Sequence, residues 1–185
     1  IARHYSSGKY YAVQNGMRLS YNLKKWLPPP PHPASKIYLP HFLCFGNFEK
    51  DMYNYYGHEI DHFHPVGSLR GGYYLNALRS KSINQRFDIC LISEWEPSLK
   101  DNQKFPEIGQ GIAITDNYLL RYSKIHDVKI CIATRSADYR EIDYFLQAFG
   151  ERAVIIKNDR ETMSTYRAID ESNVSVTAFS TAGVE

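Results

Sequence analysis

Polar and charged side chains follow four apolar runs in the second half of the chain, and their types suit an anionic ligand. Each run has the length of a strand in an open parallel sheet. In such a sheet the loops after the strands meet at one edge, beside helix N-termini that attract anions. A nucleotide diphosphate or monophosphate ester fits this mixture of hydroxyls, cations and a carboxylate. The residues that we expect to bind it are Ser93, Arg135, Ser136, Lys157, Asn158, Ser180, Thr181 and Glu185.

The individual residues of this set have functional roles and plainer alternatives. Ser180 and Thr181 could hold phosphate oxygens at a helix start, with Gly183 allowing close approach, or they could cap that helix. Glu185 could accept hydrogen bonds from ribose hydroxyls, or it could be a capping-box carboxylate. Arg135 is either a phosphate clamp or a solvated loop cation.

Three histidines in the first half of the chain suggest a metal site, but their spacing argues against one. His58, His62 and His64 lie within seven residues, and His62 and His64 would share one face of a strand. No cysteine or carboxylate partner has the spacing that a zinc site requires. We therefore expect no metal and no cofactor.

The glycine-rich segment 67–72 (GSLRGG) follows an apolar run, and its composition predicts a turn. It lacks the GK[ST] ending of a P-loop and does not match GxGxxG. We expect a hinge between domains or a wall of the ligand cleft, with Gly67, Ser68 and Arg70 at the interdomain cleft.

The elements that must position these residues alternate between short apolar strands and amphipathic helices, which predicts an α/β fold with parallel sheets. Predicted helices cover 111–125, 137–149 and 161–172, the second capped by Asp138 and ended by Gly150. The predicted strands are 10–14, 42–45, 63–66, 88–93, 128–134, 153–157 and 174–178.

A polar segment at 81–86 (KSINQR) predicts a domain boundary. Residues 1–80 would be the C-terminal part of a first domain, and residues 86–185 the N-terminal part of a second. The proline-rich run 27–33 predicts an extended surface connection or, alternatively, a ligand for a partner domain. Because the chain starts at Ile1 rather than Met and stops at Glu185 without tail-like composition, we expect truncation at both ends.

Composition excludes several classes of protein. Hydrophobic residues make up 43% of the chain and charged residues 23%, which is ordinary for a globular domain. A net charge of +2 without a basic stripe gives no reason to expect nucleic acid binding. The cysteines, Cys44, Cys90 and Cys131, lie inside apolar runs, which predicts buried strand thiols in a reducing compartment.

Nearly the whole chain, from QNGMR (14–18) onward, resembles the bacterial surface carbohydrate biosynthesis proteins, and two parts carry the resemblance. The first part is the set FLCFGNFEKD (42–51), YGH (56–58) and HPVGSLR (64–70). The second is STAGVE (180–185), which is similar to the Ser-Ser/Thr-x-x-x-Glu signature of a nucleotide-binding domain. More distantly, the chain is similar to GT-B glycosyltransferases and CDP-glycerol glycerophosphotransferases. One departure is IATRS (132–136) where many such transferases carry His-Pro, and Arg135 would then replace that phosphate contact.

The resemblance implies two Rossmann-like domains, an acceptor side in residues 1–80 and a nucleotide-sugar side in residues 86–185. It implies a glycosyltransferase of surface polysaccharide or lipopolysaccharide synthesis that uses a CMP-sugar or another nucleotide-sugar. The partners would be this donor and a glycan or lipid-linked acceptor. The location would be cytoplasmic, with peripheral contact to the inner membrane or to a polysaccharide assembly complex, and the piece alone would be inactive.

Glu94 is the catalytic candidate, because it follows a strand and would face the cleft between the domains; an exposed loop carboxylate is the alternative. Other functions of the same fold are CDP-polyol phosphotransfer and sugar-nucleotide epimerisation. A transferase-like scaffold subunit without catalysis is the further alternative.

Overall fold

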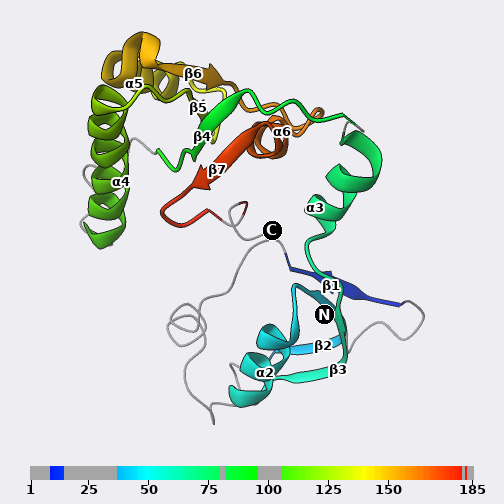
Figure 1. Ribbon diagram of the computed structural model, residues 1–185. Helices are drawn as coiled ribbons and strands as arrows, with labels where there is room; N and C mark the ends of the chain where they lie inside the picture. Colours follow the sequence, from blue (N-terminus) through cyan, green and yellow to red (C-terminus); the bar gives the residue numbers. More distant parts are fainter. Residues whose placement is uncertain (1–8, 15–36, 80–81, 96–105, 181, 183–185) are drawn as a thin grey trace. The chain divides into compact units, whose positions relative to one another are not determined.

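The computed structural model describes residues 9–14, 37–79, 82–95, 106–180 and 182. The chain divides into two compact units, Ile1–Gly72 (unit 1) and Tyr73–Glu185 (unit 2), whose elements are labelled in Figure 1. The fold is mixed α/β, with one parallel sheet in each unit. Predicted features at the proline-rich run and at Thr181, Gly183 and Glu185 lie outside the described residues.

Unit 1 holds a three-stranded sheet in the order β1-β2-β3. Its strands are β1 (Tyr11–Val13), β2 (Tyr38–Cys44) and β3 (Glu59–Pro65), and helix α2 (Asn47–Tyr55) connects β2 to β3. A short helix, α3 (Leu69–Tyr73), follows β3 and reaches the end of the unit.

Helix α2 covers one face of this sheet. Alternate residues of each strand point to that face. Phe42 and Cys44 of β2 pack against Tyr53 and Tyr56 to form the buried core of unit 1. On the opposite face, the strand register places Tyr11, His41 and His62 side by side, because Tyr11 pairs with His41 and His41 pairs with His62.

A buried carboxylate closes the loop between β2 and α2. Glu49 is the third residue of α2, and its Oε2 accepts a hydrogen bond from the backbone N–H of Gly46 (3.0 Å). Its Oε1 accepts from the side-chain amide of Gln14 (3.1 Å), whose own oxygen accepts from the N–H of Phe45. Residues after β1 and β2 are thereby tied to the start of the helix.

Unit 2 holds a four-stranded sheet in the order β6-β5-β4-β7. A π-helical turn, η3 (Tyr74–Leu78), precedes β4 (Phe87–Ile92), and the strand is followed by α4 (Pro106–Ile125) and β5 (Ile130–Ala133). The remaining elements are α5 (Tyr139–Phe149), η5 (Gly150–Arg152), β6 (Ala153–Ile156), α6 (Ser164–Asp170) and β7 (Ser172–Val176).

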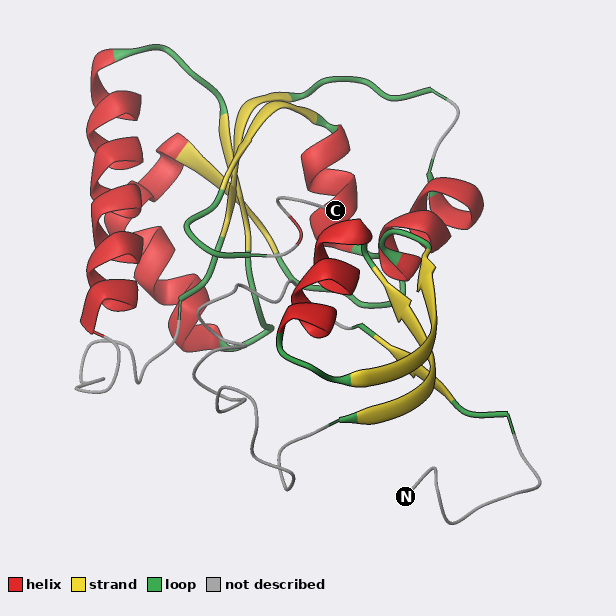
Figure 2. Ribbon diagram, turned by 90° about the horizontal axis from the view of Figure 1, so that it is seen from below, coloured by secondary structure: helices red, strands yellow, loops and turns green. Residues whose placement is uncertain are grey.

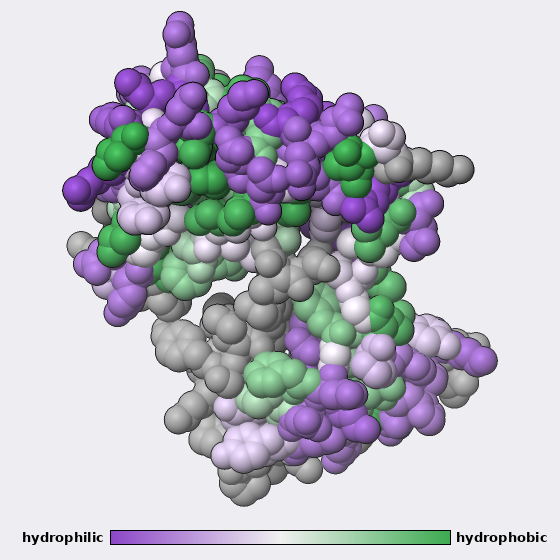
Figure 3. Space-filling view, in the orientation of Figure 1, coloured by the Kyte–Doolittle hydropathy of each residue, from purple (hydrophilic) through white to green (hydrophobic). Residues whose placement is uncertain are grey.

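Helices cover both faces of this sheet, as Figure 2 shows. On one face Leu119 of α4 and Phe145 of α5 pack on Leu91 and Ile132 of the strands. On the other face Ala168 of α6 packs on Cys90 and neighbouring strand residues. The sequence accounts for this arrangement, because continuous apolar runs are typical of strands buried on both sides. In the view of Figure 3, hydrophilic side chains cover most of the outer surface of unit 2.

The segment 74–79 belongs to unit 2 because it binds α6. The Tyr74 hydroxyl donates a hydrogen bond to Oδ2 of Asp170 (2.9 Å), and Arg79 forms an ion pair with the same oxygen (2.9 Å). The Tyr74 and Tyr166 rings stack at 5.5 Å. The units therefore divide between Gly72 and Tyr73, earlier than the polar segment 81–86 at which the sequence suggested a boundary.

Most element predictions are confirmed. Each predicted strand overlaps an observed strand, and the three predicted helices correspond to α4, α5 and α6. Asp138 caps α5 by accepting from the N–H of Arg140, and Gly150 ends that helix with φ of 56°. The turn predicted for 67–72 is wrong beyond its first residues. Gly67 does turn, with φ of 75°, but Ser68 then caps α3 by accepting from the N–H of Gly71.

The cysteines are buried strand residues, as predicted. Cys44 lies in the core of unit 1, whereas Cys90 and Cys131 lie opposite each other on β4 and β5. The hydrogen bond to Cys131, together with burial, raises the pKa of the Cys90 thiol. Among the described helices, none combines the length and the apolar character that a membrane crossing requires.

A buried histidine gives the stability of unit 1 a dependence on pH. His58 is 8% exposed, and its Nδ1 accepts a hydrogen bond from the N–H of Ile37 (3.3 Å). Burial lowers the pKa of His58 below 6.5. Unfolded chains therefore take up a proton that folded chains resist, so stability is lost as the pH falls below 6.5.

We predict that His58→Asn reduces this loss, because asparagine can keep the acceptor for Ile37 and does not titrate. Urea denaturation at pH values above and below 6.5 measures it. His58→Leu, which removes both the acceptor and the titration, should be less stable than His58→Asn at either pH by about 1 kcal/mol. Equal pH slopes for the wild type and His58→Asn would contradict the prediction.

Candidate functional site

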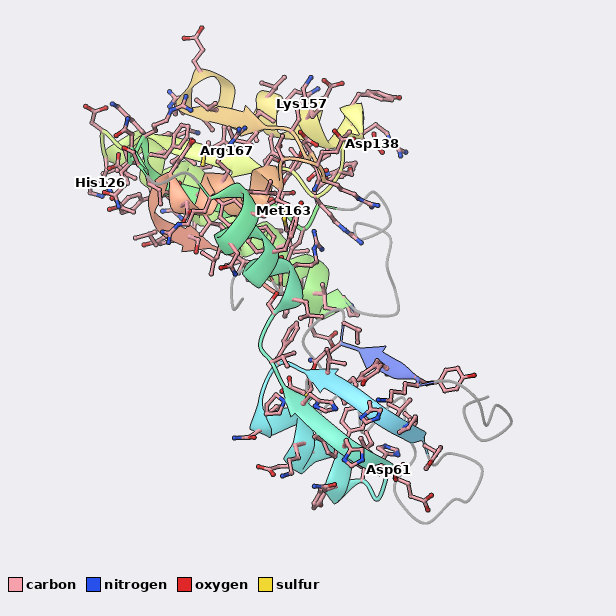
Figure 4. All side chains as sticks on the ribbon, turned by 90° about the vertical axis from the view of Figure 1, so that its right-hand side faces the viewer. Asp61, His126, Asp138, Lys157, Met163 and Arg167 are labelled. Carbon is pink, nitrogen blue, oxygen red and sulfur yellow. The ribbon has the colours of Figure 1, made fainter. Side chains whose placement is uncertain are left out.

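The order of the strands in unit 2 reverses between β4 and β7. From β4 the chain proceeds outward to β5 and β6, and then returns to the other side of β4. Loops that follow adjacent strands at such a reversal run to opposite faces of the sheet and leave a crevice between them. The candidate site is this carboxyl edge of the sheet. Figure 4 shows Asp138 and Lys157 toward this end of unit 2 and His126 at the other.

Glu94 connects the two strand ends at the reversal. Its Oε1 accepts hydrogen bonds from the Thr177 hydroxyl (2.7 Å) and from the backbone N–H of Phe179 (2.6 Å). The Thr177 oxygen in turn accepts from the N–H of Ser180 (2.9 Å). The carboxylate that the sequence suggests as catalytic therefore also fixes the loop that follows β7.

Phe179 presents an aromatic surface at this edge. Its ring lies against Gly111 of α4, where a Cβ atom would stand 3.3 Å from the ring. The absence of a side chain at Gly111 therefore lets the ring approach the helix backbone. Phe179 is 49% exposed, so part of the ring is available for contact with a planar group.

A second carboxylate, Asp116, is buried between α4 and α5. The Tyr144 hydroxyl donates a hydrogen bond to its Oδ2 (3.1 Å), and the Trp95 ring lies 6.2 Å from the Tyr144 ring. Burial raises the pKa of Asp116 to about 6; the bond from Tyr144 opposes this shift and the charge of Glu94 adds to it. Burial and Asp116 also raise the pKa of Tyr144 to about 12.

The loop after β5 is organised around Glu141, which is fully buried at 0% exposure. Its carboxylate accepts four hydrogen bonds from neutral groups. Ser93 Oγ (2.6 Å) and the Arg135 N–H (2.8 Å) donate to Oε1, and the N–H (3.0 Å) and Oγ (2.8 Å) of Ser136 donate to Oε2. Donors of this kind hold a carboxylate as they would hold any anion.

The structure brings together three of the predicted site residues around this carboxylate. The hydroxyls of Ser93 and Ser136 bind Glu141 and also accept from the N–H groups of Trp95 and Asp138. Arg135 uses its backbone N–H in the cluster, and its residue is exposed.

The other predicted residues lie elsewhere. Asn158 follows β6 and binds Thr134 through its N–H (3.0 Å) and its side-chain amide (3.4 Å), whereas Lys157 beside it is exposed. Ser180 follows β7. The remaining predicted residues, Gly67, Ser68 and Arg70, belong to unit 1.

Sequence reasoning missed Glu141, Asp116 and Phe179. Glu141 could have been found, because it stands three residues after the Asp138 cap, the spacing of a capping box. Asp116 stands three residues before the buried Leu119 on α4, so its position on an apolar helix face was a signal. Phe179 gave no signal beyond its place after a strand.

Two further features do not form part of this edge. Among the described residues, no group of three or more His, Cys, Asp or Glu side chains is arranged to hold a metal ion. A surface hollow of about 600 Å³ is lined by His126, Lys129 and Glu151 among others. It lies at the amino ends of β4, β5 and β6, away from the carboxyl edge.

Comparison with known proteins gives no match: no family model, no curated protein and no solved structure is significantly similar to the chain.

We predict that Glu141→Gln destabilises unit 2 by about 1–3 kcal/mol, because an amide NH₂ would face N–H donors that now bind an oxygen. Chemical denaturation measures the change. The matched control, Glu151→Gln, alters an exposed glutamate and should stay within about 0.5 kcal/mol of the wild type. A Glu141→Gln protein as stable as this control would contradict the role assigned to Glu141.

We also predict that Asp116→Asn stabilises the protein above about pH 7, by on the order of 2 kcal/mol. The folded pKa is raised from 3.8 to about 6, so the wild type loses stability as the pH rises through this range. Asparagine keeps an acceptor for Tyr144 and avoids the buried charge. The advantage should shrink towards pH 3.8, where the wild-type carboxyl is neutral when folded.

Denaturation curves across this pH range for Asp116→Asn and the exposed control Asp143→Asn test the second prediction. No gain in stability at neutral pH for Asp116→Asn would overturn it.

Proposed function

We propose that unit 2 binds a nucleotide-activated sugar at the carboxyl edge of β4 and β7. We further propose that the protein is a glycosyltransferase with the two Rossmann-like domains of the GT-B type, acting in surface polysaccharide synthesis. The observation that carries the proposal is the reversal of strand order between β4 and β7, where Glu94 fixes the loop after β7. Open parallel sheets with helices on both faces bind ligands at such reversals.

The nucleobase would stack on Phe179. The ring is half-exposed, and both its backbone N–H and its contact with Gly111 fix its place. Stacking of a base on an aromatic side chain contributes about 1–3 kcal/mol. Phe179 accepts any base, because every base has a flat face, so it does not choose between cytosine and uracil.

The phosphate groups would bind on the β7 side of the crevice rather than at the start of α5. Glu141 already takes the N–H groups of Arg135 and Ser136 and the hydroxyls beside them. A phosphate at that position would displace a buried carboxylate and leave it unpaired. Ser180 and the exposed Arg135 side chain remain as the proposed phosphate contacts, with Thr181 and Glu185 as the proposed continuation of the site.

In the transfer step, an acceptor hydroxyl would attack the anomeric carbon as its bond to the phosphate oxygen breaks. The hydroxyl proton passes to a base, and the electron pair of the broken bond goes to the leaving phosphate. The exposed Arg135 side chain would neutralise part of that charge. We propose Glu94 as this base. It would accept the proton on Oε2, because Oε1 holds the loop after β7.

Binding of CMP, CDP, UDP and GDP to the 185-residue chain tests the proposal, by calorimetry and by thermal stabilisation. A nucleotide at about 100 times its dissociation constant should add about 2.7 kcal/mol to stability. Phe179→Ala should weaken binding by about 1–3 kcal/mol, whatever the base. Tyr118→Ala, which removes another exposed ring of unit 2, from α4, should leave the affinity unchanged.

The distribution of products separates the proposed function from its alternatives. Release of nucleotide from its sugar only when a glycan acceptor is present supports the transferase. Turnover of nucleotide-sugar without an acceptor supports an epimerase, and transfer from a CDP-polyol supports the phosphotransferase. Binding of no nucleotide would overturn the proposed site and leave the scaffold subunit as the better description.

A further inference from the structure

The face of the unit 1 sheet that does not carry α2 gathers three histidines from two strands. His41 stands on β2, and His62 and His64 stand on β3. Parallel register pairs His41 with His62 and places His64 one side-chain step further along the same face. The three rings have centroids within 6.5 Å of one another.

Two of these imidazoles meet through nitrogen atoms. His41 Nδ1 lies 3.1 Å from His64 Nε2, and the pair is partly exposed to solvent. Two lone pairs that face each other at this separation would repel, so a proton or a metal cation must lie between the two ring nitrogens. Either one nitrogen carries a proton and donates it to the other, or both lone pairs point at one cation.

The separation also fits a metal ion. Zinc binds imidazole nitrogen at about 2.0–2.1 Å, so two ligands at a tetrahedral angle stand about 3.3 Å apart. The observed distance of 3.1 Å lies close to this value. A metal could therefore take the position between the two nitrogens with little movement of either ring, once each ring carries its proton on its other nitrogen.

The neighbouring rings hold His41 in the orientation that such a site needs. Tyr11 stacks on one side of His41 at 4.6 Å and 17°, and His62 stacks on the other at 4.8 Å and 18°. A ring held on both faces loses little further freedom when its nitrogen binds a metal. This stacking performs the part that an outer-shell hydrogen bond performs in many metal sites.

We propose that His41 Nδ1 and His64 Nε2 bind one divalent transition-metal ion on this face of unit 1. His62, whose side chain is exposed, stacks on His41 and supports its orientation, and water completes the coordination. Imidazole ligands select Zn²⁺, Cu²⁺ or Ni²⁺ over Mg²⁺ and Ca²⁺. Partial exposure makes the bound ion exchangeable. The site lies within unit 1 and does not depend on the proposed nucleotide site.

The local sequence pattern does not contain this site. Within residues 58–64 only His62 and His64 share a face, whereas His58 is buried at the other end of β3 with its Nδ1 on Ile37. The partner, His41, comes from a strand more than twenty residues earlier and is supplied by register alone.

Calorimetric titration of the untagged chain with ZnCl₂ and NiCl₂ tests the proposal, with MgCl₂ as the negative metal. We expect one Zn²⁺ or Ni²⁺ ion per chain and no binding of Mg²⁺. Removing a ligand should cost at least the roughly 10- to 100-fold in affinity that removal of an outer-shell partner costs. His41→Ala and His64→Ala should each show such a loss, and His62→Ala a smaller one.

His126→Ala is the matched control, because it removes an exposed histidine of unit 2 and should bind zinc as the wild type does. Circular dichroism and melting curves show whether each variant is folded; His64→Gln, which keeps side-chain bulk, replaces His64→Ala if the latter unfolds. A Co²⁺-loaded chain should also show visible absorption that His41→Ala lacks. Binding that is absent, or equal in His41→Ala, His64→Gln and His126→Ala, would overturn the proposal.

Discussion

A buried glutamate at the third position of a helix fixes the end of the parallel sheet in each unit. Glu49 holds the N–H of Gly46 and, through Gln14, the residue after β2; Glu141 holds the groups after β4 and β5. A buried ionised carboxylate is stable only when donors satisfy it, and here backbone N–H groups and neutral side chains do so. The strand ends and the helix start are therefore held in one geometry, because moving any one of them would remove hydrogen bonds from a buried carboxylate.

This arrangement decides where unit 2 can offer binding capacity. The start of α5 would ordinarily attract an anionic ligand, since its first N–H groups have no partners within the helix. Glu141 supplies that anion from within the chain, so the N–H groups of the loop after β5 already have an acceptor. The loop after β7 is fixed differently, by Glu94 from the adjacent strand, and it leaves Phe179 half-exposed. Glu141 thus occupies the hydrogen-bond donors after β5, whereas Glu94 holds the loop after β7 and leaves the Phe179 ring exposed.

The sequence predicts the strands well and the side-chain partnerships poorly, for a physical reason. Apolar runs such as those containing Cys90 and Cys131 identify strands because burial on both faces demands continuous hydrophobicity. Strand register carries no such local signal, so the meeting of His41 and His64 could not be foreseen. The glycines at 71 and 72 misled the prediction of a turn, since Ser68 caps a helix that tolerates them. Glu94 was placed correctly after β4, but its hydrogen bonds to the β7 loop depend on strand order.

The distribution of cysteines gives the chain a built-in reporter for each unit. Cys44 is buried in the core of unit 1, whereas Cys90 and Cys131 face each other in the sheet of unit 2. A thiol with no solvent contact reacts with an alkylating reagent only when the surrounding structure opens. Labelling followed by mass analysis therefore separates the opening of the two sheets without any substitution. The order in which the thiols become reactive along a denaturant series would reveal whether the units unfold together or one after the other.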